Sequence, residues 1–257
     1  MAAIVYEPDA ESHVAVITID RPDARNAVNG EVATGIEEAL DQIEADDSIW
    51  LSILTGTPPV FCAGADLKEI NAGRARELQT KRGGFAGLVR RERKKPVIAA
   101  VDGPALAGGT EIALSCDLIV ASSSATFGIP EVKRGIVAGG GGLFRLGRRI
   151  PFNVAMEWAL TGDSYPAERA AEFGLVNRLV EPGEALGEAK KLAAEIAANG
   201  PLAVQLSRQV MLDTTYKSEE EGWAASGEAV RTVFKSSDLK EGIQAFIEKR
   251  PPRWTGS

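Results

Sequence analysis

Hydrophobic and polar residues follow two different periods along this chain. Residues 14–19 alternate and end at Asp20-Arg21-Pro22, a pattern typical of a strand that runs into a turn. Residues 31–45 instead place apolar side chains three and four positions apart, which predicts an amphipathic helix. Short apolar runs predict further strands over residues 50–55, 96–101 and 117–121.

Helical spacing dominates the second half of the chain. We expect helices over residues 110–115, 153–160, 167–173, 184–198, 201–211 and 219–234. Residues 68–93 are predicted to be helical with interruptions at glycines. Strands alternate with helices over the first 150 residues and helices fill the last 100. This order predicts an α/β core followed by a helical C-terminal region.

Composition and charge narrow the class of protein. The chain has 257 residues, of which 44% are hydrophobic and 25% charged, as in globular proteins with a sizeable core. Its formal charge of -7 disfavours nucleic acid as the main partner. Two cysteines, Cys62 and Cys116, are too few for a disulfide framework. With no signal peptide or membrane span visible, we expect a cytoplasmic protein that binds neither nucleic acid nor membrane.

The single histidine excludes several mechanisms. His13 lies near the first predicted strand, where we expect an exposed residue at a strand edge. A Ser-His-Asp or Cys-His site needs a histidine beside a nucleophile, and no G-x-S-x-G elbow is present. One histidine and two scattered cysteines do not make a usual zinc ligand set. Carboxylates, lysines and backbone amides remain to carry any chemistry.

Two junctions between a strand and a helix could supply backbone N–H groups. In residues 60–70, a helix is predicted to begin near Asp66, a good N-capping residue. In residues 102–117, two adjacent glycines lead into a helix whose first turn carries Glu111. Gly109 stands where the lysine of a phosphate loop should be, which disfavours an ATP site. A plain capped turn and a helix-stabilising glutamate explain the same residues.

A third glycine-containing segment covers residues 125–142. Glu131 follows Phe-Gly-Ile-Pro, an apolar neighbourhood that could raise the pKa of its carboxyl group. Four consecutive glycines, 139–142, imply tight packing or close approach of a ligand. A surface glutamate after a proline turn is the alternative. Taken together, the residues indicate acid/base chemistry beside an activated carbonyl, which needs no metal or redox cofactor.

Three segments resemble the signature regions of the enoyl-CoA hydratase (crotonase) family: FCAGADLK at 61–68, AGGTEIA at 107–113 and FGIPE at 127–131. Further matches at 20–22, 160–162 and 245–250 extend the resemblance over nearly the whole chain. The resemblance implies the crotonase fold, a spiral of ββα units with a helical C-terminal region that drives trimerisation. We therefore expect residues 1–195 to form the core with the CoA-thioester site and residues 196–257 to form the helical C-terminal region.

The resemblance also implies residue roles. The amides of Ala65 and Gly108 match the family's oxyanion hole, and Glu111 and Glu131 match its two catalytic carboxylates. The implied reaction is syn addition of water to a trans-2-enoyl-CoA, in which Glu111 activates the water and Glu131 supplies a proton to C2. Coenzyme A enters as part of this acyl thioester, so no separate cofactor is expected. Positions that match the family's CoA contacts are Ala27, Asp66, Leu67, Lys68 and Lys249.

The match to the C-terminal region predicts a trimer or hexamer, with Phe246 and Lys249 near a subunit boundary. Asp117, after the helix that carries Glu111, is expected to be structural. Departures from the family pattern are Val137-Ala138 before the glycines, Thr110 before the first glutamate, and Arg25 where an apolar residue is usual. They leave both glutamates intact and bear on acyl-chain preference.

Alternatives stay open at this point. Isomerases, carnitinyl-CoA-type dehydratases, hydrolases and carbon–carbon bond lyases of the family reuse the oxyanion hole but usually alter an acidic position. A non-catalytic binding protein, such as an RNA binder, is a further alternative. The basic run at residues 90–95 is its one support, and we interpret that run as a solvated helix end.

Overall fold

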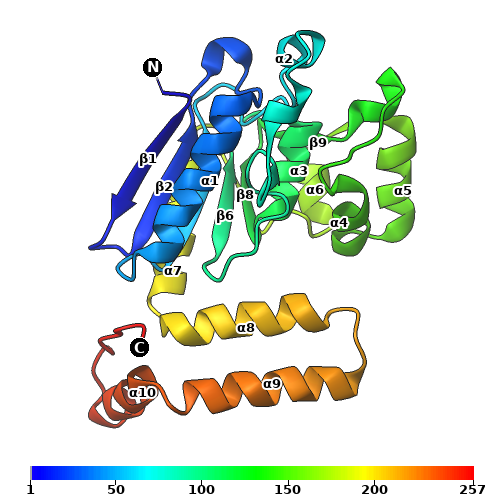
Figure 1. The fold of residues 1–257 in the computed structure, drawn as a ribbon. Helices are drawn as coiled ribbons and strands as arrows, with labels where there is room; N and C mark the ends of the chain where they lie inside the picture. The colour runs from blue at the N-terminus through cyan, green and yellow to red at the C-terminus, as the bar shows by residue number, and fades with distance from the viewer. Residues whose placement is uncertain (1) are drawn as a thin grey trace.

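A six-stranded sheet forms the centre of the computed structural model, which describes residues 2–257 (Figure 1). The strand order is β1-β2-β3-β6-β8-β11, with β1 antiparallel to β2 and the other neighbours parallel. The strands are β1 (Ile4–Asp9), β2 (Val14–Ile19), β3 (Leu51–Gly56), β6 (Val97–Val101), β8 (Leu118–Ser122) and β11 (Arg178–Val180).

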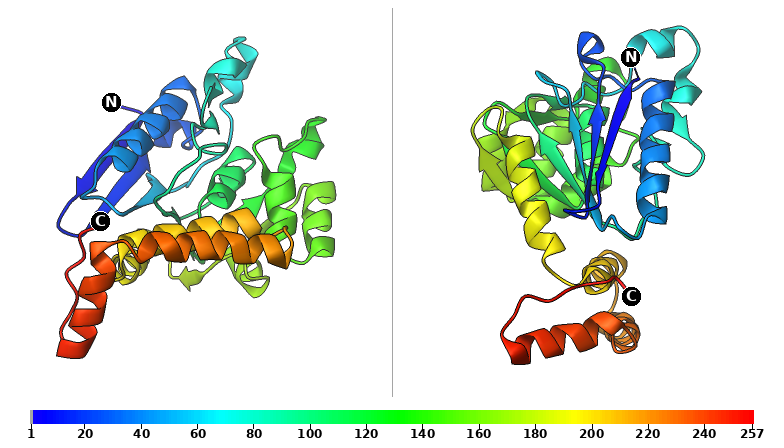
Figure 2. Two further views of the ribbon diagram at one scale, coloured as in Figure 1. Left: turned by 60° about the horizontal axis from the view of Figure 1, so that its bottom comes forward. Right: turned by 90° about the vertical axis from the view of Figure 1, so that its left-hand side faces the viewer.

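Helices cover both faces of this sheet, as parallel strands require (Figure 2). Alternate residues of each strand point to opposite faces. Ile17 and Ile19 of β2 pack in one core with α1 (Gly30–Ala45), whereas Val14 and Val16 pack in a second core with α7 (Ala185–Ala197). The Asn29 side chain caps the start of α1 by accepting from the Val32 amide.

Smaller elements stand at the edge of the sheet where the parallel strands end. A three-stranded sheet joins β7 (Ala105–Leu106), β9 (Thr126–Gly128) and β10 (Ser164–Pro166). Around it lie α3 (Gly108–Ser115), the 3-10 helix η3 (Pro130–Arg134), α4 (Gly142–Arg149), α5 (Phe152–Thr161) and α6 (Ala167–Glu172). The 3-10 helix η1 (Pro22–Ala24) follows β2.

Three helices, α8 (Pro201–Thr214), α9 (Glu219–Val233) and α10 (Ser237–Glu248), project from this body (Figures 1 and 2). They carry large apolar side chains that remain exposed, among them Trp223, Phe234 and Phe246. Among residues 2–257, no helix is both long enough and apolar enough to cross a membrane.

The predicted α/β architecture is confirmed, and every predicted strand is present. The prediction of an interrupted helix over residues 68–93 is wrong. The chain forms α2 (Leu67–Asn71), the 3-10 helix η2 (Ala75–Leu78), and a short hairpin of β4 (Gln79–Thr80) and β5 (Gly84–Phe85). Its glycines fold the chain back on itself: a Cβ on Gly83 would lie 2.0 Å from the Gly87 carbonyl oxygen. Strands β1, β7, β9, β10 and β11 and helices α4 and α10 were not predicted.

The basic run at residues 90–95 is not a solvated helix end, contrary to the prediction. Lys95 is buried, and its Nζ donates to the carbonyl oxygens of Ile43 and Asp46 at 2.6 and 2.7 Å. These carbonyls belong to the end of α1, where helices leave acceptors unpaired. Arg93 is also buried and binds Asp117.

His13 is not an exposed strand-edge residue either. It lies in the turn between β1 and β2 with a positive φ of 60°, and it is half-buried. Its ring stacks on Trp50 with 3.5 Å between centroids, and Nδ1 lies 2.8 Å from the Ser48 carbonyl oxygen. These contacts give His13 a structural role in the turn.

Candidate active site

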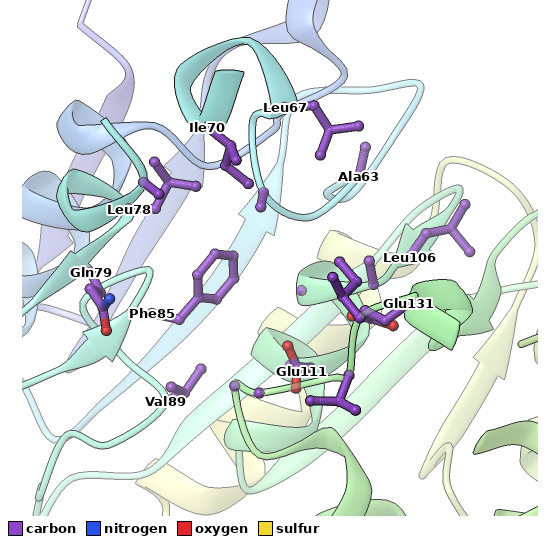
Figure 3. A pocket seen from close by; sticks show the side chains of 18 of the residues that line it. Ala63, Leu67, Ile70, Leu78, Gln79, Phe85, Val89, Leu106, Glu111 and Glu131 are labelled. Atoms are coloured by element: carbon purple, nitrogen blue, oxygen red, sulfur yellow. The ribbon is translucent and has the colours of Figure 1, made fainter. Parts of the chain in front are cut away.

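A cavity of about 540 Å³ lies where α3, η3 and residues 67–90 meet. Figure 3 shows Glu111 and Glu131 together on one side of it, with Leu78, Phe85 and Val89 across from them. The cavity brings together five residues predicted from the sequence: Ala65, Leu67, Gly108, Glu111 and Glu131.

The backbone amides of Ala65 and Gly108 line the cavity, and neither has a hydrogen-bond acceptor in the described part of the chain. The amide of residue 65 stays unpaired although its neighbours bond to Val28: the Val28 amide donates to the Gly64 oxygen, and the Asp66 amide donates to the Val28 oxygen. Gly108 is the first residue of α3, where helix amides have no partner within the helix. Both amides are therefore available to an oxygen atom of a ligand.

Close packing of two glycines brings these junctions together. Gly64 has φ +92°, and a Cβ there would lie 2.9 Å from both the Ala107 Cβ and the Gly108 nitrogen. Ala107 itself takes an unusual conformation, φ 52° and ψ −125°, and its amide donates to the Gly128 oxygen at 2.8 Å. Strained backbone of this kind clusters at functional sites.

Glu111 lies in the first turn of α3 and is 4% exposed. Its Oε1 accepts from the Gly142 amide at 2.9 Å. Burial raises the pKa of this carboxyl to about 7, and the nearby Glu131 adds to the rise, whereas the Gly142 bond opposes it. A pKa near neutrality suits a group that gains and loses protons at physiological pH.

Two glycines of the run at 139–142, Gly140 and Gly142, pack against the Glu111 side chain. A Cβ on Gly140 would lie 2.6 Å from Glu111 Oε2, and one on Gly142 would lie 3.0 Å from the Glu111 Cγ. The predicted tight packing is therefore confirmed for Gly140, Gly141 and Gly142, whereas Gly139 is exposed.

Glu131 comes from the start of η3, directly after Pro130. It is 8% exposed, and its buried Oε2 has no hydrogen-bond partner. Burial raises the pKa of its carboxyl group, as predicted from the apolar neighbourhood. An unpaired buried oxygen is costly, so it points to a proton or a ligand that engages it there.

The residues that form the opposite wall of the cavity were not predicted from the sequence. Ile70, Leu78, Phe85 and Val89 supply apolar side chains, and Arg25, Arg90 and Arg134 add three exposed cations. Most of these residues lie in the segment predicted as helical, and helical spacing would have spread them over several faces. Only Arg25 and, within the basic run, Arg90 had been singled out.

Other predicted binding residues lie outside the cavity lining. Ala27 is buried, and its carbonyl oxygen accepts from Arg21. Asp66 caps α2 by accepting from the Lys68 amide at 3.0 Å and pairs with Arg21 at 3.1 Å, as its predicted capping role requires. Lys68 is exposed on α2, and Lys249 ends α10, outside this cavity.

Asp117 joins three parts of the chain. It binds Arg93 and Arg208 at 2.5 and 2.8 Å, and it accepts from the Val97 amide at 2.8 Å. Its position at the end of α3 agrees with the structural role expected for it. Within residues 2–257 there is no group of three His, Cys, Asp or Glu side chains able to hold a metal ion.

Comparisons with known proteins find relatives that match nearly the whole chain. Residues 9–257 match the family model described as enoyl-CoA hydratase/isomerase. The chain is 40% identical to Enoyl-CoA hydratase EchA19 of Mycobacterium tuberculosis, over 99% of both chains. It is 40% identical to the short-chain-enoyl-CoA hydratase of Clostridium acetobutylicum, over 94% of both. A crystal structure of an enoyl-CoA hydratase from M. tuberculosis superposes with a TM-score of 0.95 at 49% identity, over the full length of both chains.

These similarities extend over nearly the whole chain and agree with the α/β architecture and the glycine-lined cavity. The predicted resemblance and the crotonase fold are confirmed. The chain belongs to the enoyl-CoA hydratase/isomerase family.

Proposed function

We propose that the protein is a hydro-lyase, an enoyl-CoA hydratase that adds water to a trans-2-enoyl-CoA to give a 3-hydroxyacyl-CoA. The observation that carries this proposal is the pairing of two buried glutamates, Glu111 and Glu131, in one cavity with two unpaired amides. Full-length similarity to enoyl-CoA hydratases supports it.

The amides of Ala65 and Gly108 would receive the thioester oxygen. As water attacks C3, negative charge moves to this oxygen, and fixed N–H donors stabilise the enolate that results. No metal or redox cofactor takes part, and coenzyme A arrives as the carrier half of the substrate. Leu67 in the cavity and Lys68 beside it would contact the CoA portion, as would Ala27 and Asp66, with Lys249 reaching it from a neighbouring subunit.

The two glutamates would divide the proton transfers. Glu111, as a carboxylate, takes one proton from the attacking water while the water oxygen bonds to C3. Glu131, as a neutral acid, gives its proton to C2, where the enolate collapses. A proton returns from Glu111 to Glu131 after product formation. Burial raises the pKa of both carboxyl groups, that of Glu111 to about 7, which favours proton exchange at this pair near neutral pH.

Glutamine substitutions test the proposal. Glutamine keeps the size of the side chain but cannot exchange a proton, so Glu111→Gln and Glu131→Gln should each lower turnover of crotonyl-CoA by ~10²–10⁴-fold. Binding of a CoA thioester should survive in both, because the two amides are intact. Since both carboxylates serve one water, the double variant should lose much less than the product of the single losses.

Glu157→Gln is the matched control, since Glu157 is exposed on α5 outside the cavity. Loss of the conjugated enoyl absorbance follows the reaction. A family isomerase that uses one base would tolerate one of the two substitutions, and a non-catalytic binding protein would tolerate both. Hydration within a few-fold of the parent in Glu131→Gln would end the two-glutamate mechanism.

We also propose that the protein assembles as a trimer or hexamer through α8–α10. Support comes from large apolar side chains left exposed on these helices: Trp223 is 71% exposed and Phe246 86%. Large apolar side chains exposed to this extent are typical of association sites. Light scattering should give a mass of three or six chains, and an active monomer would contradict the proposal.

The proposed setting is acyl-CoA metabolism in the cytoplasm. Cys62 and Cys116 are both buried as free thiols, a state that a reducing compartment preserves. Burial raises the pKa of each thiol to about 12, which keeps both unreactive.

A further inference from the structure

A second cavity, of about 530 Å³, lies between α4, α8 and the chain before β6. Only Val89 lines both this cavity and the one that holds Glu111. Six arginines line it: Arg91, Arg93, Arg145, Arg148, Arg149 and Arg208. Asp117 is the one carboxylate among its lining residues in the described chain.

The positive charge of this arginine cavity is not balanced. Asp117 serves both Arg93 and Arg208. Arg91 pairs with Asp41, a carboxylate that also binds Arg82. Arg145, Arg148 and Arg149 have no carboxylate within ion-pair distance among residues 2–257. The cavity therefore concentrates cations in a protein whose formal charge is -7.

Neutral acceptors hold two of these unpaired side chains in place. Arg145 donates to the carbonyl oxygens of Gly140 and Val89 at 3.0 and 2.6 Å, and Arg149 donates to that of Cys116 at 2.5 Å. Carbonyl oxygens orient a guanidinium but leave its charge uncancelled. Burial lowers the pKa of Arg145, and the neighbouring Arg149 lowers it further, as expected when like charges crowd together.

Arg91 supplies a second, independent observation. Its side chain is only 8% exposed, yet its Nε and Nη1 have no hydrogen-bond partner. Buried N–H groups are rarely left unpaired in folded proteins. An acceptor that is not part of this chain would satisfy them.

We propose that the arginine cavity is a binding site for a phosphate-bearing metabolite, separate from the site of the proposed hydration. The planar guanidinium fork matches phosphate oxygens in pairs, which favours phosphate over a simple halide. Apolar side chains of Leu114, Leu175 and Met211 line the same cavity and fit a nonpolar part of such a ligand. The volume lies within the range of small-molecule pockets.

Arg148 offers a clean test because its removal disturbs little. It is exposed, makes no ion pair, and stacks over the Tyr216 and Phe144 rings at 4.5 and 5.1 Å. Titration calorimetry of the full chain with pyrophosphate at low salt should give saturable binding with one site per chain. Arg148→Gln should weaken this binding by about tenfold, because one charge-assisted bond is lost, while thermal unfolding stays unchanged.

Two control variants locate the binding. Arg169 is another surface arginine stacked on an aromatic ring, 4.1 Å from the Phe173 centroid, but outside the cavity. Arg134 lines the cavity that holds Glu111. Arg169→Gln and Arg134→Gln should bind pyrophosphate as the parent does. A loss confined to Arg134→Gln would place the anion at the CoA end of the other cavity and overturn the proposal.

Two further outcomes would also overturn it. The first is heat that never saturates at millimolar pyrophosphate, which would indicate weak surface binding only. The second is no binding together with a changed oligomer mass in Arg148→Gln, which would show that the arginines receive carboxylates of another chain.

Discussion

The two walls of the catalytic cavity are built in different ways. On one wall, residues 63–65, 107–111 and 139–142 meet through backbone atoms, with glycines packed at distances that leave no room for a Cβ. On the other, residues 67–90 contribute apolar and cationic side chains from short elements joined by turns. The backbone wall holds the two amides and Glu111, with Glu131 beside it on η3, and the side-chain wall holds the apolar groups that would contact the acyl chain.

This difference implies different tolerance to substitution. A main-chain donor keeps its position only while the packing around it is kept, so a single added methyl group should disturb the chemistry. A side chain on an irregular segment can change size with a local effect on binding. Three substitutions test this contrast, from the largest expected effect to the smallest.

Gly64→Ala should lower turnover of crotonyl-CoA by ~10²-fold or more, the typical cost of losing an oxyanion donor. The new Cβ would meet Ala107 and the Gly108 amide at 2.9 Å, in a backbone conformation that L-residues rarely adopt. Gly73→Ala is the matched control, since Gly73 also has a positive φ, +79°, but no atom within 4 Å of a Cβ. Equal losses in the two variants would assign the effect to backbone strain alone.

Glu111→Gln should make stability less dependent on pH. The pKa of Glu111 is about 7 in the folded protein against an ordinary 4.5, so the folded state binds the extra proton between these values. Its contribution is full below about pH 4.5 and is lost as pH rises through 7. The unfolding free energy of the parent, relative to Glu111→Gln, should fall by about 3 kcal/mol from pH 4 to pH 8.

Urea denaturation at several pH values measures this difference, with Glu157→Gln as the variant that should follow the parent throughout. If the difference in unfolding free energy between Glu111→Gln and the parent stayed constant with pH, burial would not raise the pKa of the Glu111 carboxyl. The difference measures how much stability the folded protein loses by burying the ionised Glu111 carboxylate in the backbone wall.

Val89→Ala should change acyl-chain preference by about tenfold, in favour of longer chains, with crotonyl-CoA turnover within a few-fold of the parent. Val89 is buried in the side-chain wall, and removing two methyl groups enlarges the cavity. The ratio of kcat/KM for long and short enoyl-CoA esters measures the change. Val5→Ala, at an exposed position of β1, should leave this ratio unaltered.

The backbone wall could largely be predicted from the sequence, and the side-chain wall could not. The short motifs around Gly64, Gly108 and Glu131 can be recognised from local sequence alone, because each lies within a few residues of a junction between elements. The Glu111–Gly142 bond spans 31 residues, and only the unusual run of glycines indicated close packing there. Residues 67–90 carry helix-compatible side chains, but contacts with distant parts of the chain override that local preference.

The buried basic residues show a second limit. Arg93 and Lys95 belong to a run of charges that ordinarily faces solvent, and their burial depends on acceptors elsewhere. Asp117 and the end of α1 provide those acceptors, from positions more than 20 residues away. Nothing in the local pattern of the run signals such partners.

The contact between Gly64 and Gly108 has a consequence for engineering. The oxygen-binding element here is made of peptide groups, so side-chain mutagenesis cannot convert it into a different element; it can only preserve it or break it. Libraries aimed at new substrates therefore gain nothing from diversity at residues 63–65 or 107–109. Varying Leu78, Phe85 and Val89 would change which acyl chains the cavity accepts. Every variant in such a library would keep the same reaction centre.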